Sequence, residues 1–362
     1  MNEIENRQLQ GRIKNIKRLK YGIYADLDLG ENVCHIMYDK SQKNLPANGD
    51  IIKVDARNLI TSEKIPTLLV DNVKIVNRCL DPNKLNAKIK ELLIIRRKIE
   101  YIIEKNFEEA GALKVSSAIL NKYRGTSKVE PFETTDKKGK EFFLRFTHGM
   151  ALKKMVCDTL MPVYETGKVF RNMGKSSRHV HEYNMIESQF PFKSINYAVK
   201  LSQQIMKDIA QYFGCNNFEE LPVYTVAELF SRAGYDINNL SDEDKKIIFK
   251  NKIKKQDGPF FSVYPPSQWS PLTVQNEDNT ARDAEFVYQK MGLIHITEEE
   301  YNYEKIKSIM IQQDVEPAHL DRDFLNKMEG GMPPTVGVAL GTDRIIAAFQ
   351  KKTIQEIIPY ER

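Results

Sequence analysis

The chain has 362 residues, of which 41% are hydrophobic and 28% are charged, and its formal net charge is +5. These proportions are those of a globular protein, long enough for two domains around one large core. No apolar run reaches the roughly 20 residues of a membrane-spanning helix, and the first residues lack the pattern of a secretion signal. The four cysteines have no metal-binding spacing, so we expect a cytoplasmic protein with free thiols and no membrane partner.

The first 80 residues alternate short β-rich runs with turns that contain Gly, Asp and Asn. Five short strands favour a small barrel, and the oligonucleotide-binding (OB) fold is a good candidate. Basic residues crowd the first strand, so Arg12 and Arg18 are expected on a positive face that can contact RNA. A merely solvated edge is the alternative. The expected strands are residues 9–16, 22–29, 33–38, 50–56 and 67–75.

The remaining residues favour a second, larger domain. The segment 81–83 (Asp-Pro-Asn) is typical of a linker, whose asparagine can cap the helix that follows. Apolar residues then recur at helical spacing up to about Glu109, which predicts a long amphipathic helix. Ser194 is expected to cap another helix. Residues 216–258 mix helix and loop and indicate no chemistry, and the rest favours a mainly antiparallel sheet with flanking helices.

The segment 169–187 has the pattern of a strand, a basic loop and a second strand. Arg171 ends the first strand with a fork of donors suited to a phosphate, and Tyr183 offers a flat ring on which a base can stack. Side chains alternate along a strand, so one face of the second strand should carry His179, His181, Tyr183 and Glu187. This pattern predicts a nucleotide site.

A second segment, residues 330–344, joins a Gly-Pro turn to a strand of small residues, and a helix is expected over residues 345–349. A glycine-lined strand lets a ligand approach the backbone closely. Arg344 stands at the junction of this strand with the helix, where it can meet an anion or cover a base.

The order of these two segments and the residues they contain resemble motifs 2 and 3 of class II aminoacyl-tRNA synthetases, in particular the lysyl-tRNA synthetase branch. The similarity runs from residues 11–13 through 124–125, 131–132 and 270–272 to Arg344. It implies an α+β protein in which an N-terminal OB-fold β-barrel, the anticodon-binding module, precedes an antiparallel catalytic sheet flanked by helices. The implied domains are residues 1–80 and 81–362.

Residues 111–120 resemble motif 1, which forms the dimer seam of class II enzymes, although Ala118 replaces the family's proline. The resemblance therefore implies a homodimer. It also places Tyr24 and His35 where the family contacts the bases of tRNA, although Tyr24 could equally pack in the barrel.

The resemblance implies ATP and Mg²⁺ as ligands. Arg171 and Arg344 would be the catalytic arginines, the first on the α-phosphate and the second across the adenine from Tyr183. Glu285 would bind magnesium. Both arginines could instead be part of a salt-bridged scaffold. The full set implied for ATP is Arg171, Arg178, His179, Tyr183, Glu285 and Arg344.

The amino-acid substrate would lie against Gly149, Glu187, Gln189, His295 and Glu299. Glu187 and Glu299 match acidic positions that bind an amino group of the substrate in the family. Glu299 lies in a run of charged residues, which could instead simply face the solvent. The other three depart from the family, which has a glutamate at Gly149, a tyrosine at Gln189 and an asparagine at His295.

Two further departures affect ATP, since the family's glutamates at Met173 and Gly292 are absent. An uncompensated buried ammonium is costly, so the loss of a carboxylate at Gly149 makes ordinary lysine a doubtful substrate. The loss of two ATP contacts leaves a weakened or inactive site as an open alternative.

The leading hypothesis is a ligase that forms an aminoacyl-adenylate from ATP and an amino acid and passes the acyl group to an acceptor. The acceptor is tRNA if the barrel contacts RNA, and otherwise a protein or a small amine. A rival hypothesis is a non-catalytic paralogue that keeps the fold to bind RNA or a regulatory ligand. A metal hydrolase built on His179 and His181 is a weaker third, because the nucleotide motif already accounts for His179.

Overall fold

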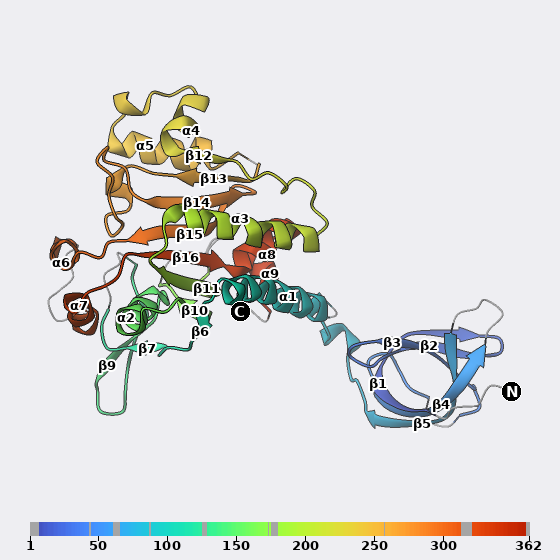
Figure 1. Cartoon of the computed structure of the whole chain (residues 1–362). Coiled ribbons are helices and arrows are strands. Elements are labelled where there is room, and N and C mark those ends of the chain that lie inside the picture. Colours follow the sequence, from blue (N-terminus) through green and yellow to red (C-terminus); the bar gives the residue numbers. More distant parts are fainter. Residues whose placement is uncertain are drawn as a thin grey trace. The chain divides into compact units, whose positions relative to one another are not determined.

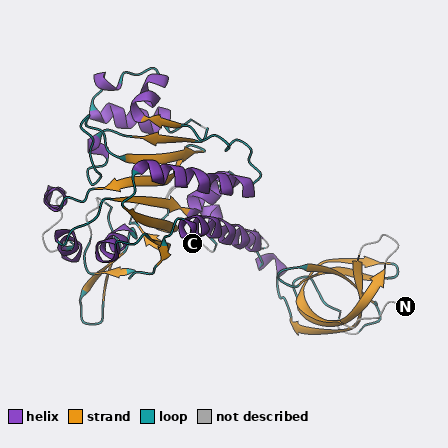
Figure 2. Cartoon of the chain, viewed as in Figure 1, coloured by secondary structure: helices purple, strands orange, loops and turns teal. Residues whose placement is uncertain are grey.

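The computed structural model of the chain describes residues 7–42, 45–60, 66–86, 88–124, 129–172, 174, 180–256, 258–312 and 321–359. The chain divides into two compact units, Met1–Ile89 and Lys90–Arg362. The first unit is a β-barrel, and the second is a large sheet with helices against it (Figures 1 and 2). None of the described helices is both long and apolar enough to cross a membrane.

The barrel is closed in the strand order β1-β2-β3-β5-β4. Only β3 and β5 pair in parallel, and a bulge in β1 between Lys14 and Lys17 bends that strand. Strand alternation sends Ile13, Leu27 and Ile36 into the interior, where they are fully buried. The predicted OB-like barrel is therefore confirmed. The strands are β1 (Arg7–Leu19), β2 (Gly22–Asp28), β3 (Val33–Tyr38), β4 (Ile51–Ile60) and β5 (Pro66–Asn77).

The predicted linker forms the short 3-10 helix η1 (Pro82–Lys84), and the long helix α1 (Lys88–Glu109) follows it. Asp81 accepts a hydrogen bond from the backbone N–H of Asn83 at 3.0 Å. The expectation that the linker asparagine caps the long helix was wrong, because Asn86 does so, by accepting from the N–H of Lys88 at 3.1 Å.

The larger unit is built on an eight-stranded sheet in the order β12-β13-β14-β15-β16-β11-β10-β6. Neighbouring strands are antiparallel except for the pairs β12/β13 and β6/β10, which agrees with the predicted mainly antiparallel sheet. The order makes β11 and β16 neighbours, so the two signature segments, far apart in sequence, meet at the centre. The strands are β6 (Leu113–Lys114), β10 (Val163–Phe170), β11 (Glu182–Pro191), β12 (Val223–Thr225), β13 (Phe260–Val263), β14 (Asp283–Tyr288), β15 (Met291–Glu299) and β16 (Thr335–Gly341).

One face of this sheet is buried beneath α1, α3 (Ile195–Tyr212) and α8 (Thr342–Gln350) (Figure 1). On β16, Val336, Val338 and Leu340 are buried in this core. Because side chains alternate along a strand, Gly337 and Ala339 face the opposite side, where they line a cavity. The small residues predicted to leave room for a ligand are thus on the side of the sheet that the helices leave open.

Helix α3 begins after Ser194 as predicted, but the Ser194 hydroxyl makes no capping hydrogen bond. The carboxylate of Glu298 accepts instead from the N–H of Ile195 at 3.2 Å. The other helices are α2 (Gly149–Thr159), α4 (Val226–Arg232), η2 (Ile237–Asn239), α5 (Asp242–Ile248), the π-helix η3 (Phe249–Ile253), η4 (Ser267–Trp269), α6 (Tyr303–Gln312), α7 (Arg322–Glu329) and α9 (Ile354–Ile357), and a small sheet holds β7 (Leu120–Asn121), β8 (Glu133–Thr135) and β9 (Glu141–Leu144).

Candidate active site

A cavity of about 560 Å³ lies on the open face of the sheet. The strand register sets its floor as two parallel rows of side chains that cross β14, β15, β16 and β11. The first row is Glu285, His295, Ala339 and Glu187, and the second row is Asp283, Thr297, Gly337 and Gln189. Residues from four strands therefore converge on one surface because their registers match.

The end of the cavity nearest to the β10–β11 loop holds Arg171, Tyr183 and Arg344. The Arg171 guanidinium carbon lies 5.5 Å from the centre of the Tyr183 ring, and its Nε donates to the carbonyl of Phe146 at 3.4 Å. Burial raises the pKa of Tyr183, and the positive charges of Arg171 and Arg344 oppose this rise. A neutral aromatic ring with two guanidinium groups beside it can hold a base and a phosphate together.

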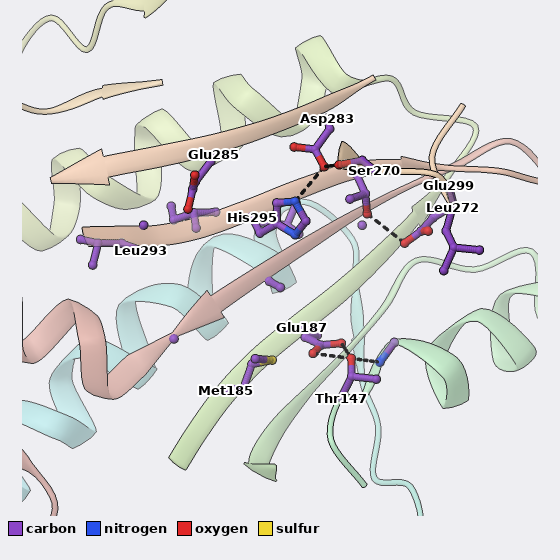
Figure 3. Close-up of a pocket in the computed structure, with 18 of the residues that line it drawn as sticks. Thr147, Met185, Glu187, Ser270, Leu272, Asp283, Glu285, Leu293, His295 and Glu299 are labelled. Carbon is purple, nitrogen blue, oxygen red and sulfur yellow. Dashed lines mark hydrogen bonds and ion pairs between the residues drawn. The ribbon is translucent and has the colours of Figure 1, made fainter. Parts of the chain in front are cut away.

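Glu187 is the last residue of the first row, on β11, and is only 6% exposed. The Thr147 hydroxyl, 2.7 and 2.8 Å from its two carboxylate oxygens, donates to it, and the N–H of Gly149 donates to the Thr147 oxygen at 3.1 Å. Figure 3 shows Thr147 directed at Glu187. A Cβ on Gly149 would lie 3.2 Å from a Glu187 oxygen, so α2 begins close against this carboxylate. Among the residues described, no cation forms a salt bridge with Glu187.

Glu299 closes the far end of the cavity and has three partners. Lys153 Nζ lies 2.6 Å from Oε2, and Gln189 Nε2 and the Thr297 hydroxyl donate to Oε1 at 3.0 and 3.1 Å. Gly337 makes this contact possible, because a Cβ there would lie 2.7 Å from Gln189 Nε2 and 2.8 Å from Glu299 Oε1. Glu299 is thus a buried, fully paired carboxylate and not part of a solvated charge run.

His295 forms a chain of contacts with Asp283 and Ser270 (Figure 3). Its Nε2 lies 2.8 Å from Asp283 Oδ2, to which the Ser270 hydroxyl also donates at 2.6 Å. The Asp283 carboxylate raises the pKa of His295 to about 9, so the ring is a cation at neutral pH.

Glu285 lies at the edge of the floor beside Gly292 and Lys254. Lys254 Nζ is 2.5 Å from Glu285 Oε2. A Cβ on Gly292 would lie 1.8 Å from Glu285 Oε1, so the carboxylate fills the space that a side chain at this position needs. In the described part of the chain no group of three or more metal-binding side chains is present. A Mg²⁺ ion at a phosphate site is commonly held by one or two carboxylates together with substrate phosphates and waters, and Glu285 could supply one such oxygen if Lys254 shared or left its carboxylate.

The cavity brings together most of the residues that the sequence indicated, namely Gly149, Arg171, Tyr183, Glu187, Gln189, Glu285, His295, Glu299 and Arg344. Met173, Arg178 and His179 lie outside the described residues. His181 does not line the cavity. It precedes the first residue of β11, so strand alternation does not apply to it, and its ring packs edge-on against Phe132 at 5.5 Å.

Sequence reasoning missed Thr147, Lys153, Lys254 and Asp283. Residues 216–258 were taken to carry no chemistry, yet Lys254 reaches Glu285 from this segment. No local pattern marks it, because it is one lysine in a lysine-rich run. Asp283 was detectable in principle, since it stands two residues before Glu285 and therefore on the same face of β14.

On the barrel, Tyr24 and His35 share an outward face. Tyr24 lies opposite Lys17 on β1, and Asp26, two residues further along β2, lies opposite His35 on β3. His35 Nδ1 lies 2.8 Å from Asp26 Oδ1. A base-sized ring, a lysine and an exposed imidazole therefore lie close together on the surface of the barrel.

The two barrel arginines lie elsewhere. Arg12 Nη1 donates to the carbonyl of Gly49 at 2.8 Å, so it holds a loop in place. Arg18 lies opposite Ile23, whose side chain is buried in the barrel core. Because opposite residues share a face, Arg18 is on the other side of β1 from Lys17 and Tyr24.

Comparison with known proteins gives a consistent result. The sequence model described as tRNA synthetases class II (D, K and N) matches residues 71–362. The lysine–tRNA ligase of Mycoplasmoides gallisepticum is 24% identical, over 92% of this chain and 77% of its own length. Those of Mycoplasma genitalium and Thermoanaerobacter pseudethanolicus are each 26% identical, over 82% and 72% of this chain and 74% and 62% of theirs.

Proposed function

Because the chain belongs to the class II tRNA synthetases (D, K and N), we propose that it activates an amino acid with ATP and transfers the product to tRNA. The observation that carries the proposal is that Arg171, Tyr183 and Arg344 line one cavity together with the buried carboxylate of Glu187. A nucleotide and an amino acid can meet in such a cavity.

In the first step an oxygen of the substrate carboxylate attacks the α-phosphorus of ATP. The new P–O bond forms as the bond to the β-phosphate oxygen breaks, and pyrophosphate leaves. No proton is transferred and no protein nucleophile is needed, so catalysis depends on bringing two anions together. Arg171 and Arg344 supply positive charge at the phosphate, and Glu187 holds the α-amino group so that the carboxylate faces Arg171.

The chain's own residues supply further positive charge for this step. Lys254, paired with Glu285 at 2.5 Å, adds a cation at the same edge of the cavity. We assign it to the outer phosphates, because a phosphate can share an ammonium with a carboxylate. In the second step a hydroxyl at the 3′ end of tRNA attacks the acyl carbon, the bond to the phosphate oxygen breaks, and the hydroxyl proton passes to a phosphate oxygen of the AMP that leaves.

Two further features support the choice of tRNA as the acceptor and of a dimer as the working form. The barrel presents Lys17, Tyr24 and His35 on one face, a set suited to a base and its phosphate. Within residues 111–120, which resemble the dimer-forming motif, Leu113, Ile119 and Leu120 are exposed, and a partner subunit would cover them.

ATP–pyrophosphate exchange with each amino acid in turn tests the proposal. We expect exchange with at least one amino acid, and a loss of at least about 100-fold in Arg171→Ala, because a transition-state charge contact disappears. Arg171→Lys is the matched control, because it keeps the positive charge but loses the paired N–H donors of the guanidinium. This variant should retain part of the activity. Failure to exchange any amino acid would favour a paralogue that only binds RNA.

A further inference from the structure

Among the described residues, the acidic side chains that line the cavity all have a cationic partner, with one exception. These acidic side chains are Glu187, Asp283, Glu285 and Glu299. Asp283 pairs with His295 at 2.8 Å, Glu285 with Lys254 at 2.5 Å, and Glu299 with Lys153 at 2.6 Å. Within the described part of the cavity, only Glu187 has no cationic partner; a hydroxyl is its sole polar contact.

The pairing of these carboxylates decides how many ammonium groups of a bound ligand the cavity can neutralise. The α-ammonium group of any amino acid can form an ion pair with Glu187. A second ammonium, such as that of a lysine side chain, would need a second unpaired carboxylate, because a buried charge without a partner is strongly disfavoured. Among its described residues the cavity offers none.

At the far end of the cavity, the carboxylate that could bind a second ammonium is already occupied. Glu299 is 6% exposed. Its carboxylate oxygens form an ion pair with Lys153 and accept hydrogen bonds from Gln189 and Thr297. Lys153 comes from α2, on the protein's own chain, and its ammonium already lies where a cationic side chain would have to bind. The neighbouring pair of His295 and Asp283 is neutral as a whole, so it neither attracts nor compensates a net charge.

We infer that Lys153 acts as a built-in substitute for a substrate ammonium, so that the cavity selects an amino acid with an uncharged side chain and rejects lysine. The inference rests on the proposed function and narrows it, since the relatives compared above are lysine–tRNA ligases. Lys153 is a specificity residue, because it acts through Glu299 and touches no reacting atom.

The experiment compares L-lysine with L-norleucine, in which a methyl group replaces the ammonium, and with the other uncharged amino acids. Binding to the full chain is measured by calorimetry, and activation by pyrophosphate exchange. The uncharged amino acid that binds best should be preferred over lysine by at least about 100-fold. Lysine that binds equally well or better overturns the inference, and so does the absence of binding by every uncharged amino acid.

Variants at the ion pair sharpen the test. Lys153→Ala frees Glu299 and opens space, so the ratio of lysine to uncharged amino acid should rise at least about tenfold. The double variant Lys153→Ala/Glu299→Gln opens the same space without a free carboxylate and should not show this rise. If Lys153→Ala does not fold, the wild-type comparison still decides.

The outcomes separate this inference from the proposed function. Exchange with lysine would overturn the inference and leave amino-acid activation standing. Selective binding of an uncharged amino acid without any exchange would overturn amino-acid activation and leave the selectivity of the cavity intact.

Discussion

The buried ion pair between Arg145 and Glu165 gives a prediction whose size follows from the structure. It lies next to the site and ties β10, whose last residue directly precedes Arg171, to the segment that carries Thr147. Arg145 Nη1 lies 2.5 Å from Glu165 Oε1, and Arg145 Nε donates to the carbonyl of Lys168 at 2.8 Å. Because Glu165 is 2% exposed, removal of the arginine leaves a carboxylate with little access to water.

The pKa of Glu165 gives the magnitude. Burial alone would raise this pKa, but the nearby His148 imidazole, whose Nδ1 lies 3.5 Å from Oε1, and hydrogen bonds from Ser117 and Arg145 outweigh burial and lower it from 4.5 to about 2. This fall corresponds to about 3 kcal/mol of stability. Because the folded pKa lies below the unfolded one, the contribution is fully present above about pH 4.5 and is lost as the pH falls towards 2.

We expect Arg145→Leu to lower the free energy of unfolding of the larger unit by about 3–5 kcal/mol at pH 7, and by less near pH 4. Urea titration followed by fluorescence can measure it, because the single tryptophan, Trp269, lies in this unit. The control is Arg145→Leu/Glu165→Leu, which removes both charges and should be closer to wild type. A single-variant loss under about 1 kcal/mol at pH 7 would refute the reasoning.

Three other predictions concern the nucleotide, the RNA and the histidine. Lys254→Gln should weaken ATP binding about tenfold in calorimetry with EDTA present, since a charged phosphate contact is lost; unchanged affinity would contradict the phosphate role of Lys254. Lys17→Glu combined with Tyr24→Ala should weaken the binding of single-stranded RNA and reduce its dependence on salt; equal affinity and slope would remove this face from recognition. Asp283→Asn should lower the pKa of His295, followed by NMR, from about 9 towards 6.5. Since that pKa is raised in the folded protein, the ion pair stabilises below about pH 6.5 and is lost as the pH rises through 9, and an unaltered titration would show that Asp283 is not the cause.

Periodicity and turn chemistry sufficed for the elements, since the barrel strands, α1 and the helix after Ser194 occur where the sequence indicates them. The meeting of β11 with β16 came from the family resemblance, because strand order is not a local property. Strand alternation then placed Tyr183, Glu187 and Gln189 on one face. His181 lies one residue before the strand, and its ring packs against Phe132 and does not line the cavity.

The partners of the ion pairs could not be predicted from the sequence, because they depend on the path of the chain in three dimensions. Lys153 meets a glutamate 146 residues later in the chain (299 − 153), and Lys254 meets one 31 residues later (285 − 254). Neither spacing corresponds to a helix turn or a strand pair. A lysine side chain is long and flexible, so its sequence position alone leaves many acidic partners open.

The glycines that replace carboxylates explain why these lysines matter. At Gly292 no second acid is present, and the remaining carboxylate, Glu285, lies across the glycine with Lys254 as its partner. At Gly149 the missing acid leaves Glu187 with Thr147 as its only polar contact among the residues described. Lys254 and Lys153 place positive charge beside carboxylates that line the cavity, Glu285 and Glu299. Gly149→Glu should therefore disrupt α2 near Glu187 before it restores any binding of lysine, since even a Cβ at this position lies 3.2 Å from the carboxylate.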